Sequence, residues 1–229
     1  MPLKPHRKPR KRQIKSDEIF DPRLSFRTYT DFINHISCNN IIDIFEMDCV
    51  EGLRSDNQVF LTLIHERSGF MIARILPSHT QKEVKKALDK IEKQVENKSF
   101  KKIFKVILTD RGHEFQNFES LEGSTVRKEK RTQVFFCDPN SAYQKGTIEQ
   151  SHTLLRRIFP KGRSIEKVTQ DELNLAISSI NTLTRAKLGG LSPYQVFTRR
   201  FGEDIARKLG IEKVNLDELT LRNRLFHKK

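Results

Sequence analysis

Short runs of apolar residues alternate along this chain with charged segments, and the spacing inside each run predicts a type of secondary structure. Several runs are too short for a helix and rich in β-branched and aromatic residues, which is typical of buried strands. We expect strands over residues 41–50, 58–65, 70–76, 104–109 and 133–137. A turn with a glycine at 66–69 joins the second strand to the third, so the first three strands form a meander.

In the other runs, apolar residues recur at intervals of three and four, which predicts amphipathic helices. These helices should cover residues 80–97, 147–159, 169–180 and 192–198. A Thr followed three residues later by Glu or Gln predicts a capping box at the start of the first three, at Thr80, Thr147 and Thr169. Ser192 followed by Pro193 predicts the start of the fourth. The polar segment 118–132 should form a loop or a short helix.

The order of these elements predicts an α/β fold, in which a mixed sheet carries helices packed on it. In such a fold the first and fourth strands can lie side by side. We expect a core domain over 41–200, a basic N-terminal arm and linker over 1–40, and a charged helical tail over 201–229.

Three carboxylates occupy comparable places in these elements. Asp48 lies near the end of the first strand, Asp110 follows the fourth strand, and Glu149 opens the helix at 147. Neighbouring strands would bring the two aspartates together, and the helix could carry the glutamate over them. Clustered carboxylates repel one another without a cation, and Mg²⁺ prefers such hard oxygen ligands. The pattern therefore predicts a site for Mg²⁺ or Mn²⁺, with two ions acting on a phosphodiester.

The charge of the chain favours an acidic partner. Lys and Arg number 43 against 29 acidic residues, which gives a net charge of +14, and nucleic acid is the commonest partner of such proteins. The N-terminal arm should contact DNA phosphates, although a solvated terminus is the alternative. Its predicted DNA-binding residues are Arg7, Lys8, Arg10, Lys11 and Arg12.

Four residues close to the carboxylates are further candidates for DNA contact. His152 and Arg156 share a helix face with Glu149 by their spacing. Lys145 precedes the same helix, whose N-terminus could receive a phosphate. Arg111 follows Asp110 directly. Arg156 could equally be an ordinary surface arginine.

Other classes of protein fit the sequence poorly. The three cysteines and seven histidines lack the spacing of zinc-finger ligands. No phosphate-binding loop motif occurs, so no nucleotide cofactor is expected. None of the three tyrosines has the companions that a tyrosine recombinase needs. No apolar stretch approaches a membrane span, and no secretion signal follows the basic start, so a cytoplasmic protein is expected.

Five blocks in order resemble the bacterial DDE transposases, most of all the insertion-sequence-thirty family. They read F-E-M-D-C-V-E-G (45–52), T-D-R-G-H-E-F (109–115), F-C-D-P-N-S-A-Y-Q-K-G-T-I-E-Q (136–150), L-L-R-R-I-F-P-K-G (154–162) and I-N-T-L-T-R-A-K-L-G-G-L-S-P-Y-Q-V-F (180–197). The resemblance implies an RNase H-like integrase core with a five-stranded mixed sheet. It places Asp48, Asp110 and Glu149 on the three metal-binding carboxylates.

The resemblance also implies an activity, in which DNA is cut at the ends of a mobile element and the freed 3′-hydroxyl is joined to target DNA. Proteins of this kind act as dimers or higher assemblies, here in the bacterial cytoplasm on the nucleoid. The family's usual Trp is Phe45 in this chain, and T-N-E-N is T-I-E-Q. Its usual helix-turn-helix regions are replaced by the basic arm. Two alternatives therefore stay open: a non-catalytic DNA-binding remnant, and an RNase H-like nuclease that cuts without joining.

Overall fold

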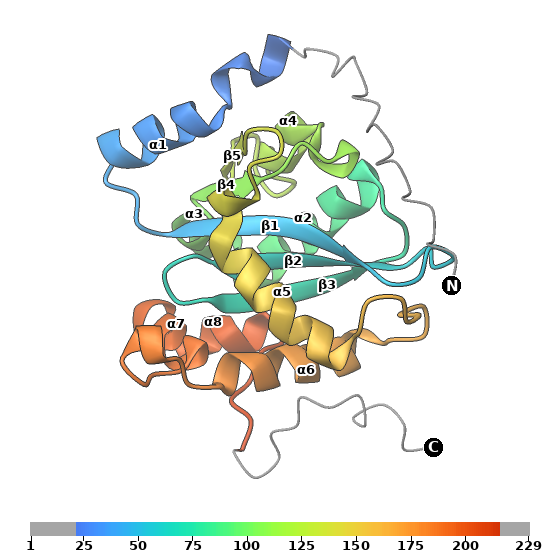
Figure 1. Cartoon of the computed structure of the whole chain (residues 1–229). Helices are drawn as coiled ribbons and strands as arrows, with labels where there is room; N and C mark the ends of the chain where they lie inside the picture. The colour runs from blue at the N-terminus through green and yellow to red at the C-terminus, as the bar shows by residue number, and fades with distance from the viewer. Residues whose placement is uncertain (1–21, 216–229) are drawn as a thin grey trace, which may run out of the picture.

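The structure, a computed structural model, describes residues 22–215, and the basic-arm residues predicted to bind DNA lie outside this range. One sheet of five strands forms its centre (Figure 1). The strands are β1 (Ile44–Glu51), β2 (Val59–His65), β3 (Phe70–Leu76), β4 (Val106–Thr109) and β5 (Gln133–Phe136). All five predicted strands are therefore present, with bounds that differ from the predictions by up to three residues.

Helices connect and cover the strands. The α-helices are α1 (Tyr29–Cys38), α2 (Gln81–Val95), α3 (Asn97–Ile103), α4 (Phe118–Glu122), α5 (Gly146–Ile158), α6 (Gln170–Thr182), α7 (Pro193–Phe201) and α8 (Glu203–Lys208). Short 3₁₀ helices are η1 (Pro22–Phe26), η2 (His113–Phe115), η3 (Ala142–Lys145) and η4 (Ala186–Leu188).

The strand order across the sheet is β3-β2-β1-β4-β5. The meander pairs antiparallel, β1 with β2 and β2 with β3, whereas β4 lies parallel to β1 and β5 parallel to β4. The first and fourth strands are thus neighbours, as predicted. A mixed five-stranded sheet with this order and with helices on it is the RNase H-like fold, which confirms the predicted fold class.

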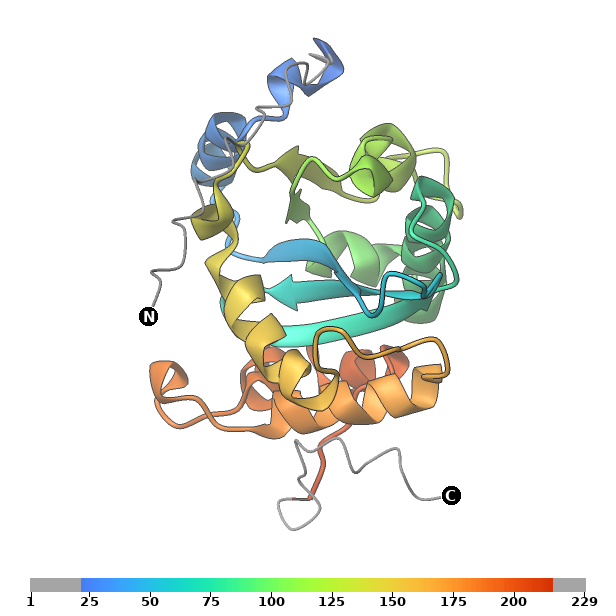
Figure 2. The same ribbon diagram turned by 45° about the vertical axis from the view of Figure 1, so that its right-hand side comes forward.

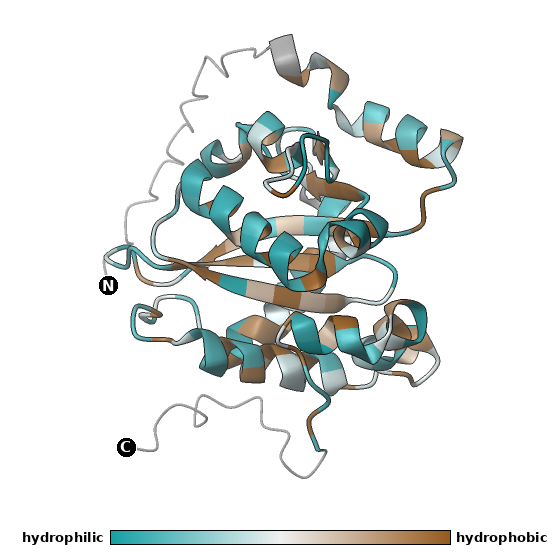
Figure 3. Cartoon of the chain, turned by 180° about the vertical axis from the view of Figure 1, so that it is seen from behind, coloured by the Kyte–Doolittle hydropathy of each residue, from teal (hydrophilic) through white to brown (hydrophobic). Residues whose placement is uncertain are grey.

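Both faces of the sheet carry helices. Helix α5 crosses one face over β1 and β2, and α2 lies against the other (Figures 1 and 2). Alternate residues of each strand therefore face different helices. Seen from behind, the outward face of α2 is hydrophilic (Figure 3), while its apolar residues, such as Leu88 and Ile91, are fully buried in the main core. Both faces of β2 are covered, and every residue of that strand is buried.

Helix α6 protects the outer edge of the sheet. The amide side chain of Asn181 accepts from the backbone N–H of Met71 and donates to its carbonyl oxygen. Gln170, about three turns earlier in α6, likewise accepts from the backbone N–H of Ile75 and donates to the carbonyl oxygen of Ala73. An exposed strand edge would otherwise present unpaired backbone groups to other chains. These two side chains close the edge at β3.

Helix α1 was not predicted, because residues 1–40 were assigned to an arm and linker. A capping box of Thr28 and Asp31 begins this helix. Its buried Phe32 packs against Phe135 of β5 with the ring centroids 5.9 Å apart. This contact belongs to a second, smaller apolar cluster on the β5 side of the molecule.

Two of the predicted capping boxes are wrong. Thr80 is the N-cap residue of α2, but its side chain makes no capping hydrogen bond. The N-cap residue of α5 is Lys145 and not the predicted Thr147, and the Lys145 side chain makes no capping hydrogen bond either. The box of Thr169 and the start at Ser192 are confirmed. The predicted helix over 80–97 is also divided, because Glu96 adopts a φ of 68° between α2 and α3.

The ends of the described chain also pack on the core. Helix α8 begins the segment predicted to be a charged helical tail, and Ala206, Leu209 and Ile211 of this region are fully buried. Residues 216–229 of that tail lie outside the described part. Among the described residues, no helix combines the length and apolarity needed to cross a bilayer.

His65 at the end of β2 gives a testable link between burial and pH. Its side chain is fully buried, with Nδ1 2.8 Å from the Ser68 hydroxyl and Nε2 3.3 Å from Asp43 Oδ1. Burial lowers the pKa of His65 from 6.5 to about 4, although Asp43 acts in the opposite direction. Between these values the unfolded chain binds the proton and the folded chain does not, so stability falls as the pH falls.

When the pH falls from 7 to 5, we expect the free energy of unfolding to fall by about 2 kcal/mol because of His65. The variant His65→Gln does not titrate and should lose less stability over this interval than the parent does. Urea unfolding at both pH values measures the difference, to which other buried histidines contribute equally in the two proteins. An equal loss in parent and variant would contradict this explanation.

Candidate active site

Asp48 lies in the second half of β1, on the face of the sheet that α5 covers. The strand was expected to end near Asp48, but it continues to Glu51 because β2 pairs with it over that whole length. The backbone N–H of Cys49 donates to Asp48 Oδ1 over 2.7 Å. Thr62 on β2 donates its hydroxyl to the carbonyl oxygen of Asp48. At Asp48 the strand is paired with β2 on one side, while its pairing with β4 on the other side has already ended.

Asp110 follows β4 at the equivalent position. The parallel register pairs Glu46 with Leu108, so continuing it by two residues brings Asp48 opposite Asp110. The hydroxyl of Thr109 donates to the carbonyl oxygen of Met47 over 3.0 Å. This bond links β4 to β1 where the backbone pairing between the two strands ends. The Asp110 carboxylate also accepts from the backbone N–H of Gly112, which fixes the turn that leaves the strand.

Glu149 lies in the first turn of α5, and Glu46 holds that helix in place. The Glu46 carboxylate accepts from the backbone N–H of Ile148 over 2.5 Å and also receives a bond from the N–H of Thr147. Glu46 of β1 therefore pairs with N–H groups at the start of α5, where the predicted capping box of Thr147 does not form. Burial raises the pKa of Glu46 to about 7, even though these two bonds act to lower it.

Lys145 lies between the two aspartates. Its Nζ is 3.0 Å from Asp110 Oδ2 and 3.3 Å from Asp48 Oδ2. Burial by itself would lower the pKa of Lys145, but the two carboxylates outweigh it and raise this pKa above its usual value. Burial raises the pKa of Asp48 too, although Lys145 acts to lower it. The site therefore stabilises a positive charge between its carboxylates.

All three predicted acids line one cavity of about 680 Å³. Lys145 and Arg111 also line it, as do Gly112, Glu114, Cys137, Asp138, Pro139, Asn140 and Ser141. The side chain of Glu149 is exposed at its rim and makes no hydrogen bond or ion pair with residues 22–215. It is therefore free to turn toward the two aspartates.

The donor set of this cavity fits a hard divalent cation. Its carboxylates come from a strand, a strand end and a helix, which are rigid elements, and Mg²⁺ binds through a few such oxygen ligands. The position of the Lys145 ammonium shows that a cation between Asp48 and Asp110 is favourable in this structure.

Of the other predicted DNA-binding residues within 22–215, Arg111 lines this cavity, and Arg156 and His152 do not. The buried Nε of Arg111 has no hydrogen-bond partner within the described residues. Arg156 lies two turns beyond Glu149 on α5 and donates to the carbonyl oxygen of Glu51 over 2.9 Å. DNA contact by these residues stays a prediction.

His152 has a contact inside the protein. Its Nε2 lies 2.8 Å from the Thr62 hydroxyl, which itself donates to the carbonyl oxygen of Asp48. The imidazole must therefore donate the first bond. Burial, followed by the charges of Lys145 and Arg156, lowers the pKa of His152 to about 4. The ring is therefore neutral at pH 7 and would not attract a phosphate by charge. Its bond to Thr62 connects α5 to β2.

Sequence reasoning did not anticipate two features of the site. Glu46 lies two residues before Asp48 and so shares its strand face, but nothing in the sequence shows that it reaches α5. Glu114 lines the cavity with a side chain that is 6% exposed. Its position two residues after Gly112 is visible in the sequence, but its burial is decided by packing.

The chain is similar in sequence to several known proteins. The chain is 33% identical over 195 residues to a putative integrase, ORF3, of Spiroplasma virus SpV1-R8A2 B, an alignment that covers 85% of this chain and 56% of that protein. It is 31% identical over 155 residues to the transposase InsI for insertion sequence element IS30C of Escherichia coli strain K12, covering 68% of this chain and 38% of that one. The chain thus spans about half, or less, of the length of these relatives.

A shorter match is 36% identical over 90 residues, to the transposase for insertion sequence element IS1086 of Cupriavidus metallidurans, covering 39% of this chain and 25% of that protein. Among solved structures, the catalytic core domain of BIV integrase aligns with a TM-score of 0.47 and 18% identity, covering 69% of this chain and 95% of that one. No model of a known protein family matches the chain.

The contact between Glu46 and α5 can be tested by mutation. Glu46→Ala leaves the N–H groups of Ile148 and Thr147 without their acceptor in a buried place, which should lower the free energy of unfolding by about 1–3 kcal/mol. Glu46→Gln keeps a carbonyl acceptor and should lose less. Urea unfolding gives both values, with Glu212→Ala as a control at an exposed glutamate. Equal stability of Glu46→Ala and the parent would show that the bond contributes nothing.

Proposed function

Because this chain carries a DDE transposase/integrase core, we propose that it cuts DNA at the ends of a mobile element and joins the freed 3′-hydroxyl to target DNA. The observation that carries this proposal is the meeting of Asp48 and Asp110 across the β1–β4 pairing, with Glu149 lining the same cavity. Both reactions are phosphoryl transfers, so one site serves for both.

In this proposal Asp48, Asp110 and Glu149 hold two divalent ions, Mg²⁺ or Mn²⁺. Bound metal would supply an activated hydroxyl and stabilise the leaving oxygen. The protein fixes the two aspartates through the strand register and the glutamate through the Glu46 contact with α5. The ammonium of Lys145 would be displaced from between the aspartates, which frees it for a DNA phosphate at the N-terminus of α5.

DNA, both element ends and target, is the partner that we propose. The net charge of +14 supplies attraction without sequence preference. Arg111 and Lys145 line the cavity, where they can neutralise the phosphates next to the reacting bond. Two ends must be cut together, so a homodimer or higher assembly is part of the proposal, acting on the bacterial nucleoid.

The catalytic assignment predicts the behaviour of three variants. Asp48→Asn, Asp110→Asn and Glu149→Gln each remove a metal ligand, and each should slow metal-dependent strand transfer of a pre-cleaved end by at least ~10³-fold, the effect of several kcal/mol on the barrier. Glu203→Gln, at an exposed residue of α8, is the matched control and should join DNA like the parent. If Glu149→Gln joined DNA at the parent rate, Glu149 would not belong to the site.

The same assay separates the alternatives. Joined products support a transposase, cleaved but unjoined products support a nuclease, and DNA binding with neither product supports a non-catalytic remnant.

DNA binding at the cavity has its own signature in salt. Arg111→Ala should weaken DNA binding and reduce the slope of log affinity against log salt by about one phosphate contact. Fluorescence anisotropy at several salt concentrations measures this slope in the parent and the variant. The matched control is Arg127→Ala, because Arg127 is exposed and lies outside the cavity. An unchanged slope for Arg111→Ala would remove Arg111 from the DNA-binding surface.

A further inference from the structure

A second group of potential metal ligands lies beside the cavity of the three acids, which one member of the group, Glu114, also lines. Cys49, His79 and Glu114 each place one ligand atom within 4.8 Å of the others. We propose that these three residues bind one divalent transition-metal ion of the Zn²⁺ type. The sequence predicted no such site, because the three ligands are far apart and follow no zinc-finger spacing.

Three different segments supply the ligands. Cys49 follows Asp48 on β1, so its side chain points to the other face of the sheet. His79 lies in the connection between β3 and α2, and Glu114 lies in η2, after the turn that carries Asp110. A metal ion bound here would therefore join the central strand to two connections that leave the sheet.

The glycine at 112 makes room for one of these ligands. A Cβ atom at Gly112 would lie 2.6 Å from Glu114 Oε2, which is closer than real contacts allow. The Glu114 side chain is only 6% exposed, so its carboxylate is folded back under the glycine and into the cluster. Any larger residue at 112 would push the carboxylate away from Cys49 and His79.

The contacts of His79 are not all satisfied when its ring is neutral. His79 Nε2 lies 2.7 Å from Glu114 Oε1, yet this buried atom makes no hydrogen bond among residues 22–215. Its other nitrogen, Nδ1, lies 3.2 Å from Glu51 Oε1. A neutral imidazole has one N–H and cannot donate to both carboxylates.

His113 also lies against the cluster. Its Nε2 lies 3.0 Å from the carbonyl oxygen of His79, which only accepts, so Nε2 donates this bond. Its Nδ1 lies 3.3 Å from Glu114 Oε2. Several electron-rich atoms thus converge on one place, which a bound cation would stabilise.

The type of ligand selects the type of metal. A thiolate and an imidazole favour Zn²⁺ and similar ions over Mg²⁺, which prefers oxygen. Bond lengths of about 2.0–2.3 Å to Zn²⁺ separate neighbouring ligand atoms by about 3–4 Å, so the present cluster needs only small shifts. Cys49 would bind as a thiolate and release its proton to solvent. His113 or Glu51, both largely exposed, or water would complete the tetrahedron.

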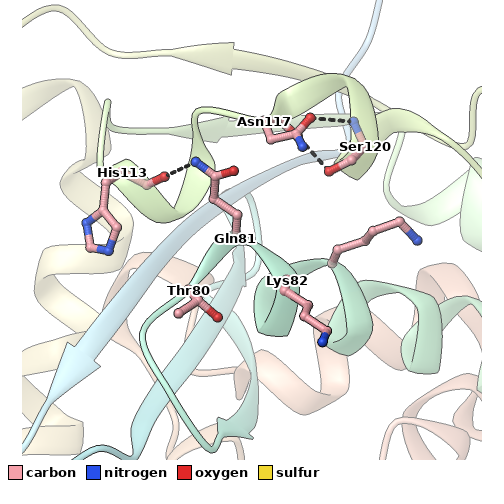
Figure 4. A pocket seen from close by; sticks show the side chains of 7 residues that line it. Thr80, Gln81, Lys82, His113, Asn117 and Ser120 are labelled. Atoms are coloured by element: carbon pink, nitrogen blue, oxygen red, sulfur yellow. Dashed lines mark hydrogen bonds between the residues drawn. The ribbon is translucent and has the colours of Figure 1, made fainter.

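The ion would also stiffen the connection that carries Asp110. Glu114 lies in the short 3₁₀ helix directly after this connection. The same 3₁₀ helix is already tied to α2, because the Gln81 side chain donates to the carbonyl oxygen of His113 over 2.8 Å (Figure 4). Both residues line a shallow pocket beside α2. The metal would add a link to β1 on the side that this hydrogen bond does not reach.

The test is a titration of the full chain with Co²⁺ under reducing conditions, followed by competition with Zn²⁺. The parent should develop a sulfur-to-cobalt charge-transfer band at one equivalent, and Zn²⁺ should abolish it. Cys49→Ser should lose this band. Cys38→Ser, which removes the exposed cysteine of α1, is the matched control and should keep it. Asp48→Asn should also keep it, which separates this site from the proposed catalytic one.

A second readout does not depend on the thiol band. His79→Gln and Glu114→Gln should lose the rise in melting temperature that Zn²⁺ gives the parent, since a ligand that binds only the folded chain stabilises it. Circular dichroism confirms that each variant is folded. The proposal is overturned if the parent shows no band, if Cys49→Ser keeps it, or if Zn²⁺ stabilises His79→Gln and Glu114→Gln as much as the parent. None of these readouts requires DNA joining.

Discussion

The parallel pairing of β1 with β4 is the constraint on which the rest of this structure depends. It is short, joining Ile44, Phe45 and Glu46 to the first three residues of β4. Because side chains alternate along a strand, a shift of one residue in this pairing would send Asp110 to the opposite face from Asp48. The bond from Thr109 to the carbonyl oxygen of Met47 holds the two strands at the point where they separate. Each aspartate then extends from a fixed backbone into the opening between the strands.

The balance of charge around β1 is a second constraint on this structure. On the α5 side, Lys145 lies between Asp48 and Asp110, while Glu46 accepts from the N-terminal end of α5. Clustered carboxylates are costly unless a cation compensates them, and the single charge of Lys145 offsets part of this cost. Next to this site, the Glu114 carboxylate lies close to ring nitrogens of His79 and His113. Two adjacent residues of one strand, Asp48 and Cys49, thus belong to the two different cation sites that we propose.

Sequence patterns succeeded where the physical cause is local. The apolar runs predicted all five strands, and the spacing of apolar residues predicted the helix at 147, whose Ile148, Leu155 and Ile158 are fully buried in the core. The patterns failed where the decisive partner is distant. The box expected at Thr147 is replaced by Glu46, which lies about a hundred positions earlier in the chain. Helix α1 was missed because its amphipathic face is narrow and is buried mainly by β5.

The sequence by itself determined the kinds of element, their order, and the three acids worth considering, because periodicity and residue chemistry act over a few neighbouring residues. The net charge alone also indicated that the protein binds an acidic partner. Only the tertiary structure decided which side chains meet: Lys145 between the aspartates, His152 against Thr62, and Cys49 with His79 and Glu114. Those meetings depend on strand register and on how helices cross the sheet. Both are set by long-range packing, which no local pattern encodes.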